Sequence, residues 1–363
     1  MKKKKKEESA LSVMPGIEQP SQVSHDAVSR LRKSRGKVIS EDEFFDGIRL
    51  GDRVLLSQAI TLIESTRHHD QHLAQKLIER CLPFAGNSIR IGITGVPGVG
   101  KSTFIEAFGS YLSAAGHQIA VLAIDPSSSR TRGSILGDKT RMEDLARDPN
   151  AFIRPSPSAG TLGGVARKTW ETVILCEAAG FDVIFIETVG VGQSEIAVHS
   201  MVDFFLLLML AGAGDELQGI KRGIMEMADA IVINKADGEN VRKAQVAASQ
   251  YRSALALFPM AESLWVPPVV TCSSREKTGV PEVWDVIEQY REHTTENGYF
   301  SNKRSMQSKI RMHQTIAEQL KTHFYHDQHI SGIIASYEKA LDENKMSAYI
   351  AAKELLELYF LRE

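Results

Sequence analysis

Six short apolar runs mark the middle of the chain, between residues 89 and 273. Each run is continuous rather than alternating and is rich in β-branched residues, the pattern of strands that are covered on both faces. We therefore expect buried strands at Ile89–Thr94, Ile119–Asp125, Val183–Glu187, Phe204–Leu210, Ala230–Asn234 and Val269–Ser273.

Amphipathic segments of helical period lie between these runs. They cover Ser102–Ala115, Val165–Ala179, Val241–Leu257 and Val280–His293. Strands that alternate with helices in this way predict an α/β fold with a mostly parallel sheet, because parallel neighbours need crossover connections.

Only helical patterns are present on the two flanks of this region. Residues 41–86 contain two amphipathic stretches, the first with an apolar stripe at Leu55, Ile60, Leu62 and Ile63. From Ser305 onward three more helices are expected. They are too small to bury much surface by themselves, so they must pack on the sheet or on a second subunit.

These patterns divide the chain into four parts. We expect a disordered lysine-rich arm over residues 1–40, a helical segment over 41–86, the sheet domain over 87–300 and a C-terminal helical segment over 301–363. The arm is polar and has no periodicity, which is typical of a segment that cannot bury a core.

Composition indicates an ordinary soluble protein. Of its 363 residues 43% are hydrophobic and 24% are charged, and the net charge of −2 does not favour nucleic acid as a partner. The most apolar run, Phe204–Leu210, is far shorter than the roughly 20 residues that span a bilayer. Three dispersed cysteines suit a reducing compartment.

Five lysines at the N-terminus have no apolar stretch behind them, so they do not form a secretory signal. They form either a solvated tail or a contact with an acidic partner or membrane surface. We expect a cytoplasmic protein that binds neither nucleic acid nor membrane.

A phosphate-binding loop is expected where the first strand ends. The stretch GVPGVGKST satisfies G-x-x-x-x-G-K-[ST], so the sheet is predicted to be that of a P-loop NTPase. Backbone N–H groups of such a loop cradle the phosphates, Lys101 reaches the β- and γ-phosphates, and Ser102 offers its hydroxyl to Mg²⁺. The expected nucleotide-binding residues are Gly95, Val96, Pro97, Gly98, Val99, Gly100, Lys101, Ser102 and Thr103.

The choice between GTP and ATP is predicted from Asn234, Lys235 and Asp237, which read N-K-A-D at the end of an apolar run. A carboxylate there can accept two hydrogen bonds from guanine, whereas adenine lacks that pair of donors. Ser273 and Ser274 close another strand, where backbone N–H groups can meet the guanine oxygen. Together these residues favour GTP.

Further carboxylates are candidates for sensing the γ-phosphate. Glu187 and Gly190 resemble a D-x-x-G turn with Glu in place of Asp, so Glu187 can hold Mg²⁺ and the Gly190 N–H can meet the phosphate. Asp125 and Asp138 can serve the metal or orient the attacking water, and Asp138 can equally be a helix N-cap. We expect Lys101, Asp138, Glu187 and Gly190 to be catalytic, and Ser102, Asp125, Asp138 and Glu187 to hold the metal.

A glycine-rich polar stretch, Gly212–Gly223, follows the most apolar strand. Its polar residues Asp215, Gln218 and Lys221 are unusual for a plain connector, so we expect a third switch that couples the nucleotide to a partner.

Taken together, the motifs resemble one family, the MeaB/ArgK-type GTPases associated with methylmalonyl-CoA mutase and related to the human MMAA protein. GITGVPGVGKST, DPSS, RGSILGDKTRM, ETVGVGQSE, GDELQGIKRGIMEMAD and NKAD occur in the family's order, and the resemblance covers about residues 41–363. Arg132 departs from the glycine expected before GSILGD, which could alter the mobility of the first switch.

The resemblance implies a homodimeric G-protein chaperone that dimerises through its C-terminal helices. It implies binding to adenosylcobalamin-dependent methylmalonyl-CoA mutase or a close relative, gating of adenosylcobalamin loading and protection of the mutase from inactivation. The chain itself is expected to hold Mg²⁺ and GTP or GDP, but no cobalamin.

Two alternatives stay open. An ATP-dependent kinase linked to arginine or ornithine transport would share the phosphate loop, but Asp237 disfavours ATP. A metal-insertion GTPase would need a ligand cluster, and no Cys-x-x-Cys is present; His323, His326 and His329 favour a surface run over a metal site.

Overall fold

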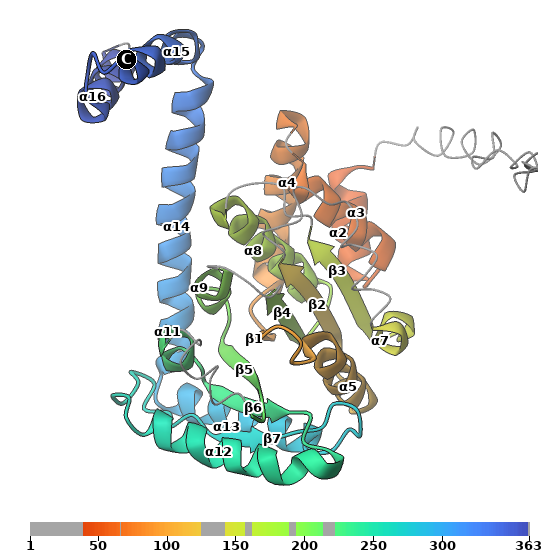
Figure 1. The fold of residues 1–363 in the computed structure, drawn as a ribbon. Coiled ribbons are helices and arrows are strands. Elements are labelled where there is room, and N and C mark those ends of the chain that lie inside the picture. Colours follow the sequence, from red (N-terminus) through yellow and green to blue (C-terminus); the bar gives the residue numbers. More distant parts are fainter. Residues whose placement is uncertain are drawn as a thin grey trace, which may run out of the picture.

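The computed structural model describes residues 39–65, 67–124, 142–156, 162–188, 194–212 and 222–361. Seven strands form one sheet in the order β3-β2-β4-β1-β5-β6-β7, and every pair is parallel (Figure 1). The strands are β1 (Ile89–Gly95), β2 (Ile119–Ile124), β3 (Ala151–Ser156), β4 (Val183–Thr188), β5 (Phe204–Leu210), β6 (Ala230–Asn234) and β7 (Val269–Thr271). The predicted α/β fold class is confirmed.

One strand, β3, is absent from the sequence-based prediction. Its sequence AFIRPS has only three apolar residues before Arg154 and Pro155. The strand lies at the sheet edge and pairs only with β2. A proline is tolerated there, because one side of an edge strand forms no hydrogen bonds to a neighbouring strand. Arg154 contacts Glu64 at 2.6 Å and Ser57 at 3.2 Å, so the helix α3 (Arg53–Glu64) covers its polar side chain.

Helices cover both faces of the sheet. On β4, Ile184 and Phe185 enter opposite apolar clusters, as the two-residue period of a strand requires. One face is covered by α5 (Lys101–Ala114), α7 (Glu143–Arg147) and α13 (Val280–Glu296). The other is covered by α8 (Leu162–Ala178), α9 (Ser194–His199), α11 (Arg222–Glu226), α12 (Val241–Leu255) and the N-terminal helices. Among the helices of the described ranges, none has the length and apolar character needed to cross a bilayer.

The N-terminal segment contains three α-helices where two stretches are predicted: α2 (Glu41–Arg49), α3 (Arg53–Glu64) and α4 (His68–Cys81), with the short turn η1 (Leu82–Phe84) behind them. Gly51 adopts φ 75°, which ends the first helix. Asp52 then caps α3 by accepting hydrogen bonds from the N–H groups of Val54 and Leu55. The break therefore lies inside the first predicted stretch.

All three cysteines are buried free thiols. Burial raises the pKa of Cys81 to about 11 and that of Cys272 to about 12, and it raises the pKa of Cys176 further still. These groups are therefore protonated and unreactive at neutral pH.

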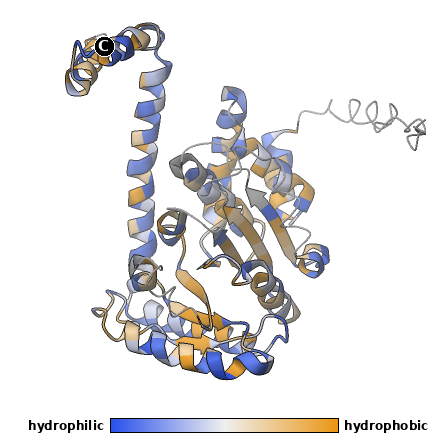
Figure 2. Ribbon diagram, in the orientation of Figure 1, coloured by the Kyte–Doolittle hydropathy of each residue, from blue (hydrophilic) through white to orange (hydrophobic). Residues whose placement is uncertain are grey.

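The C-terminal part forms a long arm. Its first helix, α14 (Tyr299–His326), has 28 residues and is therefore about 42 Å long. The helices α15 (Gln328–Asp342) and α16 (Ala348–Phe360) sit at its far end, away from the sheet (Figure 1). Figure 2 shows hydrophobic residues along the strands, whereas hydrophilic and hydrophobic residues are interspersed along α14.

A buried ion pair anchors the arm to the amino edge of the sheet. Arg304 on α14 donates two hydrogen bonds to the Asp203 carboxylate, at 2.8 and 2.7 Å, and one to the Ser88 carbonyl at 2.6 Å. Lys303 donates to the Asp203 carbonyl and Gln307 donates to the Val202 carbonyl. Asp203 is 1% exposed, so its charge depends on Arg304.

We expect Arg304→Ala to lower the free energy of unfolding by about 3 kcal/mol, because it leaves a buried carboxylate without its counter-charge. Denaturant titration of the full chain measures the loss. Arg291→Ala is the matched control: its ion pair with Glu288 is half exposed at 3.7 Å, so its cost is about 0.5 kcal/mol or less. Equal losses in the two variants would contradict this account of the anchor.

Candidate nucleotide-binding site

The carboxyl ends of β1, β5 and β6 meet at one edge of the sheet, where Gly95 aligns with Leu208 and Leu210 aligns with Asn234. β1 lies at the topological switch point, with β4, β2 and β3 to one side and β5, β6 and β7 to the other. In open α/β sheets ligands bind at such a point, outside the carboxyl ends of the strands. The motifs predicted from the sequence lie at this edge.

The phosphate loop needs glycine for two different physical reasons. A Cβ on Gly95 would lie 2.4 Å from the carbonyl oxygen of Leu208, so the loop can leave β1 beside β5 only without a side chain. Gly100 adopts φ 90° directly before α5, and a Cβ there would lie 3.3 Å from the Asn234 amide nitrogen. Without these side chains the loop can pass close to β5 and to Asn234, as suits a turn that binds phosphate through backbone N–H groups.

The side chain of Lys101 folds back onto the phosphate loop. Its Nζ donates to the Gly95 carbonyl at 3.0 Å. Burial lowers the pKa of Lys101, and the negative charges of Glu187 and Glu195 oppose that change. The ammonium therefore lies against the backbone of the loop, where phosphate oxygens could replace the Gly95 carbonyl as acceptors.

Asn234 joins the phosphate loop to the β7 side of the site. Its side-chain amide donates to the Val99 carbonyl at 2.9 Å, and its amide oxygen accepts from the Ser274 N–H and hydroxyl, at 3.2 and 2.8 Å. Asn234 is 1% exposed. These bonds, all to described residues, use both the amide nitrogen and the amide oxygen of Asn234. Asn234 and Ser274 therefore connect the phosphate loop to the chain that follows β7.

The carboxylate of Asp237, which the sequence predicts to recognise the base, also accepts a hydrogen bond from its surroundings. The Ser273 hydroxyl donates to Asp237 Oδ2 at 2.6 Å and accepts from the Glu276 N–H at 3.1 Å. Ser273 is fully buried, whereas Asp237 is part-exposed. Lys235 lies beside it with φ 57° and donates from Nζ to the Gly98 carbonyl at 2.8 Å. The lysine stem thus bridges the base side and the phosphate side.

Glu187 is buried where β4 ends, one residue before Thr188, whose hydroxyl donates to Thr94 on β1 at 2.9 Å. Ser102 is half-buried in the first turn of α5. Glu195 was not predicted: its charge acts on Lys101 from α9, and only the fold brings the two together. Asp125, Asp138, Gly190, Asp215, Gln218 and Lys221 lie outside the described residues.

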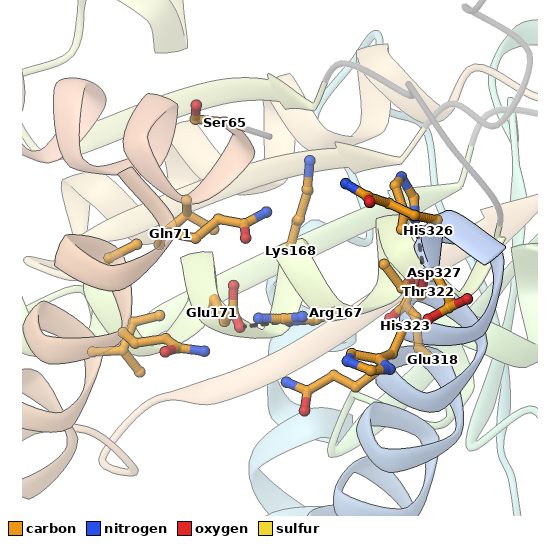
Figure 3. Close-up of a pocket in the computed structure, with 16 residues that line it drawn as sticks. Ser65, Gln71, Arg167, Lys168, Glu171, Glu318, Thr322, His323, His326 and Asp327 are labelled. Atoms are coloured by element: carbon orange, nitrogen blue, oxygen red, sulfur yellow. Dashed lines mark hydrogen bonds and ion pairs between the residues drawn. The ribbon is translucent and has the colours of Figure 1, made fainter. Parts of the chain in front are cut away.

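A cavity of about 820 Å³ lies elsewhere, between α4, α8 and the α14–α15 junction (Figure 3). It contains none of the predicted site residues. Three of its charged groups have partners: Arg167 pairs with Glu171 at 3.0 Å, and Lys168 donates to the Glu64 carbonyl. Figure 3 shows His323 and His326 on the α14 side of it. No group of three or more His, Cys, Asp or Glu side chains in the described ranges could hold a metal ion.

We expect Asp237→Ala to weaken GDP binding on the order of 100-fold, about 3 kcal/mol, because two hydrogen bonds to a carboxylate are lost. Asp237→Asn should shift the preference toward xanthosine nucleotides, since an amide offers a donor where the carboxylate only accepts. Calorimetric titration measures both variants. Glu239→Ala, which removes an exposed carboxylate two residues away, is the control. Normal GDP affinity in Asp237→Ala would refute the guanine assignment.

Lys101→Ala should lower the rate of GTP hydrolysis by at least about 100-fold and weaken binding, because a positive charge is lost from the phosphate site. The fold should survive, since among the described residues the Lys101 side chain donates one hydrogen bond, to the Gly95 carbonyl. Phosphate release and thermal melting measure the two effects. Lys243→Ala, an exposed lysine on α12, serves as control. Unchanged turnover would rule out the phosphate-loop interpretation.

Comparison with known proteins shows to which family the chain belongs. The family model described as methylmalonyl Co-A mutase-associated GTPase MeaB matches residues 56–329. A probable GTPase of Mycobacterium tuberculosis is 51% identical over 88% of this chain and 96% of its own length. GTPase ArgK of Escherichia coli is 46% identical over 85% of this chain and 94% of its own length.

Two further similarities extend the comparison. The mouse methylmalonic aciduria type A homolog, mitochondrial, is 45% identical over 88% of this chain and 79% of its own length. A crystal structure described as an LAO/AO transport system kinase superposes with a TM-score of 0.70 at 38% identity, covering 89% of this chain and 98% of that one. The family match, the P-loop NTPase fold and the similarity to named GTPases agree, and the chain belongs to the MeaB family and is a GTPase.

Proposed function

We propose that this GTPase is a G-protein chaperone of an adenosylcobalamin-dependent acyl-CoA mutase. It associates with methylmalonyl-CoA mutase or a close relative, gates the loading of adenosylcobalamin and protects the mutase from inactivation. The observation that carries the proposal is the family match over residues 56–329, because that family is described by its association with methylmalonyl-CoA mutase. The cobalamin belongs to the mutase in this proposal, and this chain binds none alone.

The chemistry assigned to the site is hydrolysis of GTP. Water attacks the γ-phosphorus, the bond to the β–γ bridging oxygen breaks, and GDP and phosphate leave. In this proposal Lys101 exchanges its bond with the Gly95 carbonyl for phosphate oxygens. Asp237, fixed by Ser273, accepts the guanine donors, and Lys235 lays its stem along the purine.

Magnesium is part of the proposal. The residues expected to hold it offer oxygen atoms, which Mg²⁺ prefers: the Ser102 hydroxyl and the carboxylates of Glu187, Asp125 and Asp138. Two observations support this set: Ser102 lies in the first turn of α5, and the negative charge of Glu187 acts on the neighbouring Lys101. When bound, the ion would neutralise charge that develops on the phosphates.

The proposal includes a homodimer formed by the C-terminal helices. An apolar cavity of about 470 Å³ lies between α14, α15 and α16, lined by side chains such as Phe324, Leu355 and Tyr359. Leu320 and Phe360 beside it are 59% and 63% exposed. Apolar surface gathered at the end of an arm supports a contact with another chain, because isolated monomers rarely expose such patches.

A cytoplasmic location and the absence of nucleic-acid and membrane partners stay predictions. The mouse relative carries the word mitochondrial in its name, and the name of the solved relative refers to a transport kinase. We favour the GTPase chaperone over the kinase for this chain, because a carboxylate at Asp237 can accept the paired donors of guanine and is itself supported by the Ser273 hydroxyl.

A pull-down with purified methylmalonyl-CoA mutase tests the partner. We expect the mutase to be retained by the full chain, and the retained amount to differ between GDP and a non-hydrolysable GTP analogue. Titration of the mutase should also raise the rate of GTP hydrolysis. No retention with either nucleotide would contradict the chaperone proposal while leaving the GTPase intact.

We expect the triple variant Asp215→Ala, Gln218→Ala, Lys221→Ala to keep GDP affinity and basal turnover within about threefold, under ~1 kcal/mol. Stimulation by the mutase should be lost, because a nucleotide-biased loop couples the two sites. GTP hydrolysis with and without mutase measures this. Replacing Arg242, Lys243 and Gln245, three exposed polar residues of α12, with Ala is the control. Full stimulation in the first variant would reduce the loop to a connector.

A further inference from the structure

A second cavity, of about 530 Å³, lies between α8, α14 and the turn η1, at the base of the arm. This volume is typical of small-molecule sites, which combine apolar walls with a few convergent polar groups. The charged lining is unequal: three guanidinium groups, from Arg90, Arg304 and Arg311, face one carboxylate, that of Glu177. The cavity therefore favours a negatively charged ligand.

Arg311 is the arginine whose donors are available in this cavity. Arg90 donates to both oxygens of Glu177, at 3.0 and 3.1 Å, and Arg304 is bonded to the buried carboxylate that anchors the arm. Among the described residues Arg311 makes no hydrogen bond, and its one ion contact reaches Glu171 Oε1 at 3.7 Å. Its side chain is 22% exposed, so a ligand in the cavity can reach the guanidinium.

The contact with Glu171 does not balance the charge of Arg311, because the same oxygen already accepts a hydrogen bond from Arg167 at 3.0 Å (Figure 3). Glu177 is paired with Arg90 in the same way. Three guanidinium groups therefore share two carboxylates, and one positive charge is left over. Burial lowers the pKa of Arg311; Glu171 opposes that change, whereas the charges of Arg167 and Arg90 add to it.

Packing of the arm does not require this third charge. The guanidinium carbons of Arg90 and Arg311 lie 4.8 and 5.3 Å from the ring centre of Trp170, so one cation already stacks on that ring without Arg311. A neutral side chain on α14 could fill the same space without the cost of bringing like charges together in a half-buried interface.

Apolar side chains beside Arg311 are left exposed. Leu82, Met312 and Ile316 line the cavity and are 57%, 52% and 48% exposed. Met312 and Ile316 are four residues apart on α14, so they share one face of that helix. The cavity thus offers a hydrocarbon chain a surface next to a guanidinium group.

We propose that this cavity binds a small monocarboxylate with an apolar chain, whose carboxylate pairs with Arg311 and whose chain lies on Leu82, Met312 and Ile316. The guanidinium fork matches the two oxygens of a carboxylate. One negative charge balances the one positive charge, whereas the dianion of a phosphate monoester would exceed it. The site is separate from the nucleotide site and requires neither GTP hydrolysis nor the mutase.

Calorimetric titration of the full chain with hexanoate tests the site. We expect a Kd of about 1 mM or lower, as suits a ligand of this size. Hexanol has the same chain without the charge and should bind at least about tenfold more weakly, because it cannot pair with Arg311. Hexyl phosphate should bind no more tightly than hexanoate.

Variants locate the site. Arg311→Met keeps an apolar stem and should weaken hexanoate binding at least about tenfold, whereas Arg311→Lys keeps the charge and should lose less. Glu171→Gln removes the competing carboxylate and should tighten binding at least about threefold, a gain that a purely structural role of Arg311 would not produce. Arg242→Met, at an exposed arginine of α12, is the control and should bind like wild type. Thermal melting confirms that each variant is folded.

Four results would overturn the proposal. They are no binding of hexanoate to the wild-type chain, equal affinity for hexanoate and hexanol, unchanged hexanoate affinity in Arg311→Met, and tighter binding of hexyl phosphate than of hexanoate. The assay contains neither GTP nor mutase, so none of these outcomes bears on the chaperone proposal.

Discussion

The side-chain amide of Asn234 is the contact on which the nucleotide site depends. It is almost fully buried, and it ties the phosphate loop at Val99 to the chain after β7 at Ser274. A loop of glycines has little conformational preference of its own, so its shape must come from such outside contacts. Because buried amides must find partners at both ends, the phosphate side and the base side of the site are fixed by the same residue.

The parallel sheet makes this arrangement possible. Its carboxyl edge brings together β1, β4, β5 and β6, so groups far apart in the chain meet without long loops. At the amino edge Arg304 and Asp203 tie the arm to the same strands. The candidate nucleotide site and the arm thus lie at opposite edges of the same sheet.

Contiguous motifs could be predicted from the sequence, whereas contacts through space could not. GVPGVGKST and N-K-A-D carry their chemistry in adjacent residues, and six strands stand out as continuous apolar runs. β3 is missed because Arg154 and Pro155 interrupt its apolar pattern. The strand accepts Pro155 because it lies at the sheet edge, and it accepts Arg154 because α3 provides a carboxylate partner. Glu195 carries no signal in the sequence, since the lysine on which its charge acts, Lys101, lies 94 residues away.

The central claim is that the edge formed by β1, β5 and β6 is a prebuilt site for guanine nucleotides. The most direct test is calorimetric titration of the wild-type chain with GDP and with ADP in the same buffer. The account predicts that GDP binds at least about 100-fold more tightly, because only guanine satisfies Asp237 with two donors. Equal affinity for the two nucleotides would contradict it.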